Sequence, residues 1–246
     1  MITGGIDIQA GSIVGLSSIV LGVAWQDGGM NIWAAVALAI LVAGLCGALS
    51  GFFVAYCGVQ PMVVTLGGSF LFTGLALLVS NMSATESYKG ISGFPDSFLQ
   101  LSKFKLFGVL PCQVIIFLVL AVIAYILLNK TKYGRMIFLI GVNKDAAEFS
   151  GINTRLVTMS TYVLSGISAA IAGVILTSYI GTAKSDIGVT FTLPIITAVV
   201  LGGTLSTGGK GSVVGTALAA VVIGVLKFGL PLCFKVSQQY LDIPVG

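Results

Sequence analysis

Residues 202–212 form the stretch of this chain that comes closest to a chemical motif. Their sequence, GGTLSTGGKGS, is close to the phosphate-binding loop G-x-x-x-x-G-K-[ST], in which backbone amides and a lysine hold nucleotide phosphates. Gly203 and Gly208 have the required separation, but a further glycine intervenes before Lys210, and a glycine replaces the magnesium-binding hydroxyl after it. Hydrophobic stretches flank the loop. We therefore expect a tight turn between helices, and no ATP hydrolysis by the chain itself.

The other reactive side chains predict no catalytic centre. The chain has no histidine, which removes His-based triads, general bases and metal ligands. Its four cysteines form no CxxC pair and are read as small buried hydrophobic residues. The 12 basic residues are scattered, which argues against nucleic acid as a partner. We predict a protein that is not an enzyme and that uses no cofactor or metal.

Two interrupted segments are the candidates for a transport site. Asp7, in GGIDIQAG, precedes one helix start and is expected to cap it, with contact to a polar substrate or a second subunit as the alternative. Residues 193–203 are too short to cross a bilayer and run from Pro194 into Gly202 and Gly203. Because apolar segments broken by glycine or proline often mark transport sites, we predict a translocation pathway along these four residues.

Lipid is the predicted surrounding of these segments. The 246 residues are 57% hydrophobic and 8% charged, against about 25% charged in soluble domains. Apolar stretches that a bilayer would accommodate follow one another along the chain: 11–25, 32–56, 61–80, 110–128, 156–179, 193–203 and 212–232. The predicted fold is all-α, a polytopic transmembrane helical bundle with broken helices, in one domain over residues 1–246.

The distribution of basic residues predicts which loops of this bundle face the cytoplasm. Loop 129–155 carries five lysines and arginines, and loop 81–109 carries three. The positive-inside rule therefore places loop 129–155 in the cytoplasm and loop 81–109 outside. The outer loop contains YKGISGFPDSF, which is compatible with a compact docking surface for an external partner and with a solvated turn.

The cytoplasmic loop holds a short helix at GVNKDAAEFSGI, residues 141–152. Asn143 suits the N-cap, and Asp145 falls in the first turn, where the helix dipole favours an acid. Gly151 stands where helices commonly stop. This pattern predicts a helix over residues 144–150.

So short a helix is marginal alone in water and needs something to pack against. Ala146 and Ala147 would allow close approach to a groove, and Phe149 is a possible anchor. The partner could be the membrane domain of the same chain or a separate cytoplasmic protein. The residues alone leave both possibilities open.

Four motifs occur in an order that resembles a known family: GGIDIQAG (4–11), YGRMIFLIGVNKDAAEFSGI (133–152), LSGISAAIAG (164–173) and ITAVVLGGTLSTGGKGSVVGT (196–216). Together they look like the inner-membrane permeases of bacterial ABC importers in the ribose and related-sugar group. Three further stretches look closest to permeases of autoinducer-2 import systems: QPMVVTLGGSFLFTGLALLVS (60–80), KGISGFPDSF (89–98) and SYIGTAKSDIG (178–188). The resemblance covers essentially the whole chain.

In this family the GxNxxAAxxSGI segment is the cytoplasmic coupling element, which docks on the ATP-binding subunit. The matching positions here are Gly141, Asn143, Ala146, Ala147, Ser150, Gly151 and Ile152. The resemblance therefore implies that docking to an ATPase explains the short helix.

The resemblance also implies the setting of the chain. It would lie in the bacterial inner membrane and work with a cytoplasmic ATP-binding subunit, a second related permease and a periplasmic solute-binding protein. The solute would be autoinducer-2 or a related small sugar-like molecule. Alternatives are a permease for ribose, rhamnose or another pentose-type sugar, an ion-coupled secondary transporter, and a non-functional permease remnant.

Permeases of this family usually have further membrane segments before the GGID motif and after the position of Gly246. We therefore expect the chain to be truncated at both ends.

Overall fold

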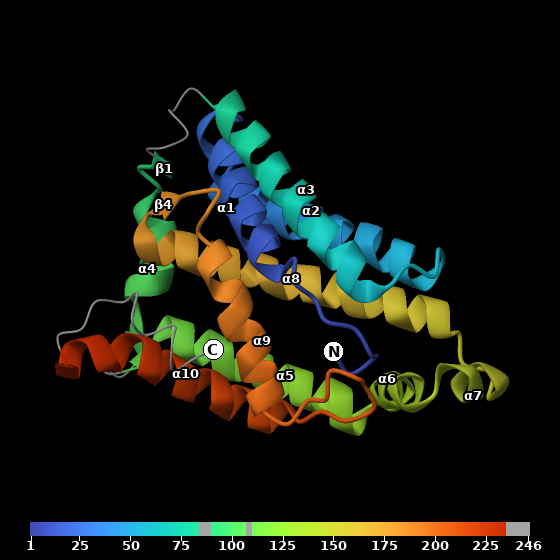
Figure 1. Cartoon of the computed structure of the whole chain (residues 1–246). Helices are drawn as coiled ribbons and strands as arrows, with labels where there is room; N and C mark the ends of the chain where they lie inside the picture. The colour runs from blue at the N-terminus through green and yellow to red at the C-terminus, as the bar shows by residue number, and fades with distance from the viewer. Residues whose placement is uncertain (84–89, 107–109, 235–246) are drawn as a thin grey trace. The chain divides into compact units, whose positions relative to one another are not determined.

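A computed structural model describes residues 1–83, 90–106 and 110–234 (Figure 1). The helices are α1 (Ala10–Gln26), α2 (Ile32–Ala55), α3 (Pro61–Met82), α4 (Asp96–Lys103), α5 (Cys112–Lys130), α6 (Lys132–Val142), α7 (Lys144–Phe149), α8 (Thr154–Ile180), α9 (Thr192–Leu201) and α10 (Val213–Phe234). The short strands are β1 (Ile91–Ser92), β2 (Lys105–Leu106), β3 (Leu110–Pro111) and β4 (Thr182–Ala183), and a 3-10 turn spans Val189–Phe191. The predicted all-α fold class is confirmed.

Four helices in the described part of the chain are long and apolar enough to cross a membrane, namely α2, α3, α5 and α8. α1 and α9 are shorter apolar helices. These elements coincide with the hydrophobic stretches that the sequence predicts, since lipid favours helices that satisfy every backbone group internally. The chain is thus an integral membrane protein.

The chain divides into two compact units. The larger unit comprises residues 7–119 and 155–190, and the smaller unit comprises residues 1–6, 120–154 and 191–246. Each is described by itself below.

Helix α1 forms the centre of the larger unit, where it packs against α2 and α3 (Figure 1). Ile13, Val14 and Leu16 are almost fully buried and share a hydrophobic cluster with Phe72 of α3 and Ala170 of α8. Serines also line α1, and Ser18 is hydrogen-bonded to Thr177 of α8, with 2.7 Å between the hydroxyl oxygens. Burial of apolar side chains and paired hydroxyls therefore fixes α1 among its neighbours.

Helices α2 and α8 approach each other at their glycines. A Cβ on Gly47 would collide with the carbonyl oxygen of Tyr162, and a Cβ on Gly166 would collide with that of Ala43. The backbones therefore touch where the side chains are absent, as the glycine-rich sequence of these helices suggests.

The loop between α3 and α5 is compact where the structure describes it. β1 pairs antiparallel with β4, with Ile91 opposite Ala183. Phe98 of α4 is fully buried, and the ring centroid of Phe94 lies 4.9 Å from that of Trp25. A structured loop, and not a solvated turn, is therefore present over these residues. The Tyr-Lys pair at the start of YKGISGFPDSF lies outside the described residues.

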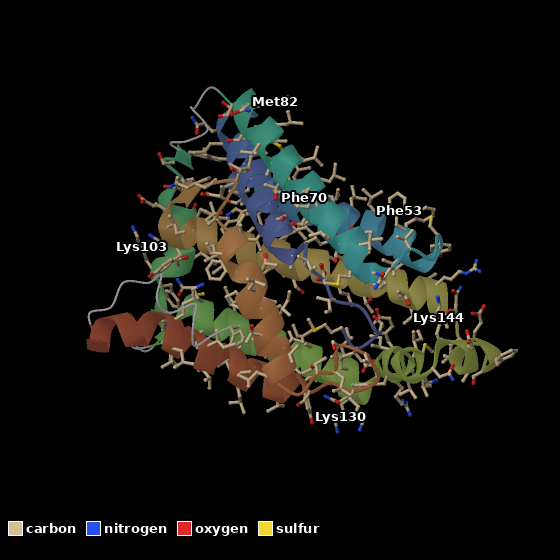
Figure 2. All side chains as sticks on the ribbon, viewed as in Figure 1. Phe53, Phe70, Met82, Lys103, Lys130 and Lys144 are labelled. Atoms are coloured by element: carbon tan, nitrogen blue, oxygen red, sulfur yellow. The ribbon has the colours of Figure 1, made fainter. Side chains whose placement is uncertain are left out.

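Large apolar side chains cover the outer surface of the larger unit. Phe53 of α2 and Phe70 and Met82 of α3 belong to this surface, and Phe70 is 73% exposed (Figure 2). Such a surface suits contact with lipid.

In the smaller unit, α9 packs along α10. Ala198 of α9 forms a buried cluster with Ala219 and Ile223 of α10. Gly202 ends α9 and lies so close to Thr216 that a side chain at this glycine would overlap the Thr216 backbone. Small residues thus allow the two helices to approach closely.

Candidate functional site

The short helix α7 is closed at its N-terminus by the predicted residue. Asn143 has an extended backbone, and its side-chain oxygen accepts a hydrogen bond from the Ala146 amide at 3.0 Å. Asp145 lies in the first turn, where the partial positive charge of the helix favours a carboxylate. The predicted N-cap of this helix is confirmed.

The C-terminus of α7 is closed by Gly151. The Gly151 amide donates to the carbonyl of Glu148 at 2.9 Å, and the Ile152 amide donates to that of Ala147 at 3.2 Å. This pair of bonds is a Schellman motif, which needs a left-handed residue, and Gly151 has φ +79°. The helix ends at Phe149 with Ser150 as its C-cap, one residue earlier than the predicted range.

The faces of α7 differ sharply. Ala147 is 3% exposed and is therefore held against its own chain, whereas Phe149 is 93% exposed. Ala146 is exposed as well. Phe149 lines an open pocket together with Asp145 and Glu148. Of the two alanines expected to meet a partner, only Ala146 is thus available, and Ala147 serves the chain's own packing.

Helix α6 leads into α7 with almost no interruption. Thr131 caps α6, because its hydroxyl oxygen accepts a hydrogen bond from the Gly134 amide at 3.2 Å. At the other end, Asn143 is both the C-cap of α6 and the N-cap of α7. A single residue therefore joins the two helices. Lys130 at the end of α5 and Lys144 at the start of α7 are two of the predicted cytoplasmic basic residues (Figure 2).

The glycine-rich loop 202–212 forms a closed turn beside the N-terminal segment. The Gly208 amide donates to the carbonyl of Leu205 at 3.1 Å, and the Gly209 amide donates to that of Ile2 at 2.8 Å. These amides are already bonded to protein carbonyls, whereas a phosphate-binding loop offers its amides to the nucleotide. The predicted tight turn is confirmed.

Asp7 lies in the larger unit and is part of a polar network. Its carboxylate accepts a hydrogen bond from the Ser165 hydroxyl at 2.6 Å and one from the Gln9 amide at 3.1 Å. Gln9 is fully buried, and its side-chain oxygen accepts a hydrogen bond from the Ser50 hydroxyl at 2.7 Å. This network ties the segment before α1 to α2 and α8.

The expected role of Asp7 as the N-cap of α1 is wrong. Gln9 occupies the N-cap position, and Asp7 lies two residues earlier. The segment before α1 is thus held in place by a carboxylate that accepts hydrogen bonds from a backbone amide and from a hydroxyl of another helix, because a partly buried acid needs such partners. Sequence reasoning missed Gln9, Ser50 and Ser165, although Gln9 stands two residues from Asp7 in an otherwise apolar approach.

The other predicted pathway residues lie in the smaller unit. Pro194 falls within the first turn of α9, two residues after the helix begins at Thr192. Gly202 caps the C-terminus of the same helix, and Gly203 follows with φ +88°. The assignment of Asp7, Pro194, Gly202 and Gly203 to a translocation pathway remains a prediction.

The apolar helices of the described residues define a membrane protein with several spans. Residues 1–240 match the model of the family described as "Branched-chain amino acid transport system / permease component", and the chain belongs to this family.

Similar proteins carry a more specific description. The chain is 44% identical over 238 residues to the autoinducer 2 import system permease protein LsrD of Yersinia enterocolitica, and 43% identical to the LsrD protein of Photorhabdus luminescens. Each alignment covers 97% of this chain and 71% of the relative. No solved structure gives a significant match. The resemblance to permeases of bacterial importers is confirmed.

Proposed function

We propose that this chain is the permease subunit of an ATP-driven importer in the bacterial inner membrane, and that it carries autoinducer-2. The observation that carries the proposal is the exposed, doubly capped helix α7 in a chain of the permease family. A separate ATP-binding subunit would dock there and drive transport.

The geometry of α7 suits docking. Phe149 is a nearly fully exposed aromatic side chain, and its burial on docking would contribute about 1.5–3 kcal/mol. Asp145 and Glu148 line the pocket with Phe149, so charged groups border the apolar anchor. An aromatic anchor inside a polar rim is the usual composition of a protein interface.

The charge distribution supports a cytoplasmic position for α7. Lys130, Lys132, Arg135, Lys144 and Arg155 all lie close to this helix in the sequence. Short loops rich in lysine and arginine stay on the cytoplasmic side of bacterial membranes. An ATP-binding subunit would be found on the same side.

The solute follows from the relatives. The similar LsrD proteins are named as permeases of autoinducer 2 import systems. We infer that this chain carries the same solute, together with a second permease and a periplasmic binding protein. A permease for ribose, rhamnose or another pentose-type sugar is the alternative within this class.

Transport into proteoliposomes that contain the assembled importer tests the proposal. We expect uptake of autoinducer-2 that requires ATP and persists when the proton gradient is dissipated. Excess ribose or rhamnose should not compete. Competition by either sugar would assign that sugar to this permease as its solute in place of autoinducer-2. Uptake that survives ATP depletion but collapses with the proton gradient would overturn the importer mechanism.

A further inference from the structure

Three backbone segments of the smaller unit meet at Gly141, in the last turn of α6. A Cβ at this position would overlap the carbonyl oxygen of Ile2 and the amide nitrogen of Gly209. Those two atoms are themselves hydrogen-bonded at 2.8 Å. The helix, the N-terminal segment and the glycine-rich loop 202–212 therefore touch through their main chains. We call this contact the glycine joint, formed by Gly141, Ile2, Gly208 and Gly209.

The other side of the joint also depends on missing side chains. A Cβ on Gly208 would lie 2.7 Å from the Gly4 amide nitrogen and 2.9 Å from the Ile2 carbonyl oxygen. A Cβ on Gly209 would lie 2.9 Å from the Val142 side chain and 3.2 Å from its backbone nitrogen. Contacts between main chains cannot yield by a change of rotamer, so a movement of one segment toward the others must be taken up by their backbones.

The joint adjoins the proposed docking helix. Gly141 precedes Asn143 by two residues, and the Asn143 amide still donates to the carbonyl of Leu139 in α6, at 3.0 Å. Because Asn143 caps both helices, we expect a displacement of α7 to move the last turn of α6. At the far side of the joint, residues 1–4 precede the segment that leads to α1, and loop 202–212 connects α9 to α10.

We propose that Gly141 is a positioning residue for transport, which passes the movement of α7 to the N-terminal segment and to the loop between α9 and α10. This inference rests on the proposed function, because it takes α7 to be the helix that the ATPase moves. It also gives a role to the glycine-rich loop, whose Gly208 and Gly209 amides are bonded to protein carbonyls. Such coupling is carried by a contiguous set of packed main chains and hydrogen bonds.

The test compares glycine variants in the complete importer, reconstituted with its ATP-binding subunit and supplied with autoinducer-2. Three quantities are measured: retention of the ATP-binding subunit during purification, ATP hydrolysis, and uptake per ATP hydrolysed. For Gly141→Ala we expect unchanged retention and continued hydrolysis, with uptake per ATP lower by roughly two- to thirtyfold, the range reported for mutations that alter coupling. A purely structural defect would lower all three together.

Two glycines provide matched controls. Gly224→Ala places the same methyl group in α10, where nothing lies within 4 Å. Gly74→Ala does the same in α3, where nothing lies within 4 Å either. Both variants should retain uptake per ATP within about twofold of the wild type, because neither forces main chains apart.

If Gly141→Ala fails to accumulate in the membrane, Gly209→Ala serves in its place, since its methyl group contacts Val142 less severely. Gly58→Ala is its control, because Gly58 has a similar φ of +70° and nothing within 4 Å. Uptake per ATP that stays normal in the joint variant overturns the inference. A wild-type chain that retains no ATP-binding subunit overturns the proposed function instead, before any variant is compared.

Discussion

The side-chain oxygen of Asn143 accepts a hydrogen bond from the backbone N–H of Ala146 at 3.0 Å, and this bond closes the first turn of α7. The six residues of α7 are too few to form a stable helix alone. The cap at Asn143, the Schellman motif at Gly151 and the burial of Ala147 together hold it in shape. The exposed position of Phe149 therefore depends on bonds made at both ends of the helix.

Asn143→Ala should loosen α7. Loss of an N-cap costs about 1 kcal/mol, which corresponds to about fivefold weaker binding of a partner that requires the helix. Asn143→Asp should preserve binding, because aspartate caps helices as well as asparagine does. The measurement is the affinity of the purified permease for its ATP-binding subunit. Equal affinity of the alanine and aspartate variants would show that the cap does not matter for docking.

Substitution of the two alanines by glutamate should separate folding from docking. Ala147→Glu puts a charge into a buried position and should destabilise the chain by roughly 2 kcal/mol or more. Ala146→Glu lies on the exposed side and should leave stability unchanged while it weakens docking. Thermal unfolding in detergent measures the first effect, and retention of the ATP-binding subunit measures the second. If Ala146→Glu destabilised the chain and Ala147→Glu weakened only docking, the observed orientation of α7 would be contradicted.

The spans and α7 could be predicted because their signals are local. Apolar runs mark α2, α3, α5 and α8, and the asparagine and glycine caps mark both ends of α7. The direction in which Ala147 faces could not be predicted, because a two-turn helix presents small residues on more than one side. Only the fold of the whole chain decides which of them is buried.

Contacts between segments far apart in the sequence were also beyond prediction. Asp7 and Ser165 are 158 positions apart, and Ile2 meets Gly209 across nearly the whole chain. A short polar side chain beside a broken helix start is compatible with a cap, a substrate contact or an inter-helix bond. The sequence therefore indicates that Asp7 needs a partner but not which residue supplies it.

Removal of Asp7 should destabilise the larger unit. Asp7→Ala leaves the Ser165 hydroxyl and the Gln9 amide without this acceptor, at a cost of roughly 1–3 kcal/mol. Asp7→Asn should cost less, because an amide oxygen can still accept one of the bonds. The stability of each variant is measured by thermal unfolding in detergent. The variants Ser165→Ala and Asp7→Ala/Ser165→Ala complete a double-mutant cycle with Asp7→Ala. Additive effects would show that the two residues are not energetically coupled.

Gly151→Ala should destabilise α7 through its backbone. The residue has φ +79° and nothing within 4 Å of a Cβ, so the cost arises from the left-handed conformation and should be roughly 1 kcal/mol. Gly67→Ala is the control, because Gly67 lies inside α3 with equally open space. Amide hydrogen exchange over residues 144–150 should accelerate in the first variant and stay unchanged in the second. Equal protection in both would contradict the Schellman cap.

The most direct measurement of the central claim is retention of the ATP-binding subunit by a tagged Phe149→Ala chain. Phe70→Ala is the matched control, since Phe70 is 73% exposed but lies within α3. If α7 is the docking helix, Phe149→Ala weakens retention by roughly ten- to hundredfold, as expected for an aromatic anchor, and Phe70→Ala retains the subunit like the wild type. Full retention by Phe149→Ala would contradict the account.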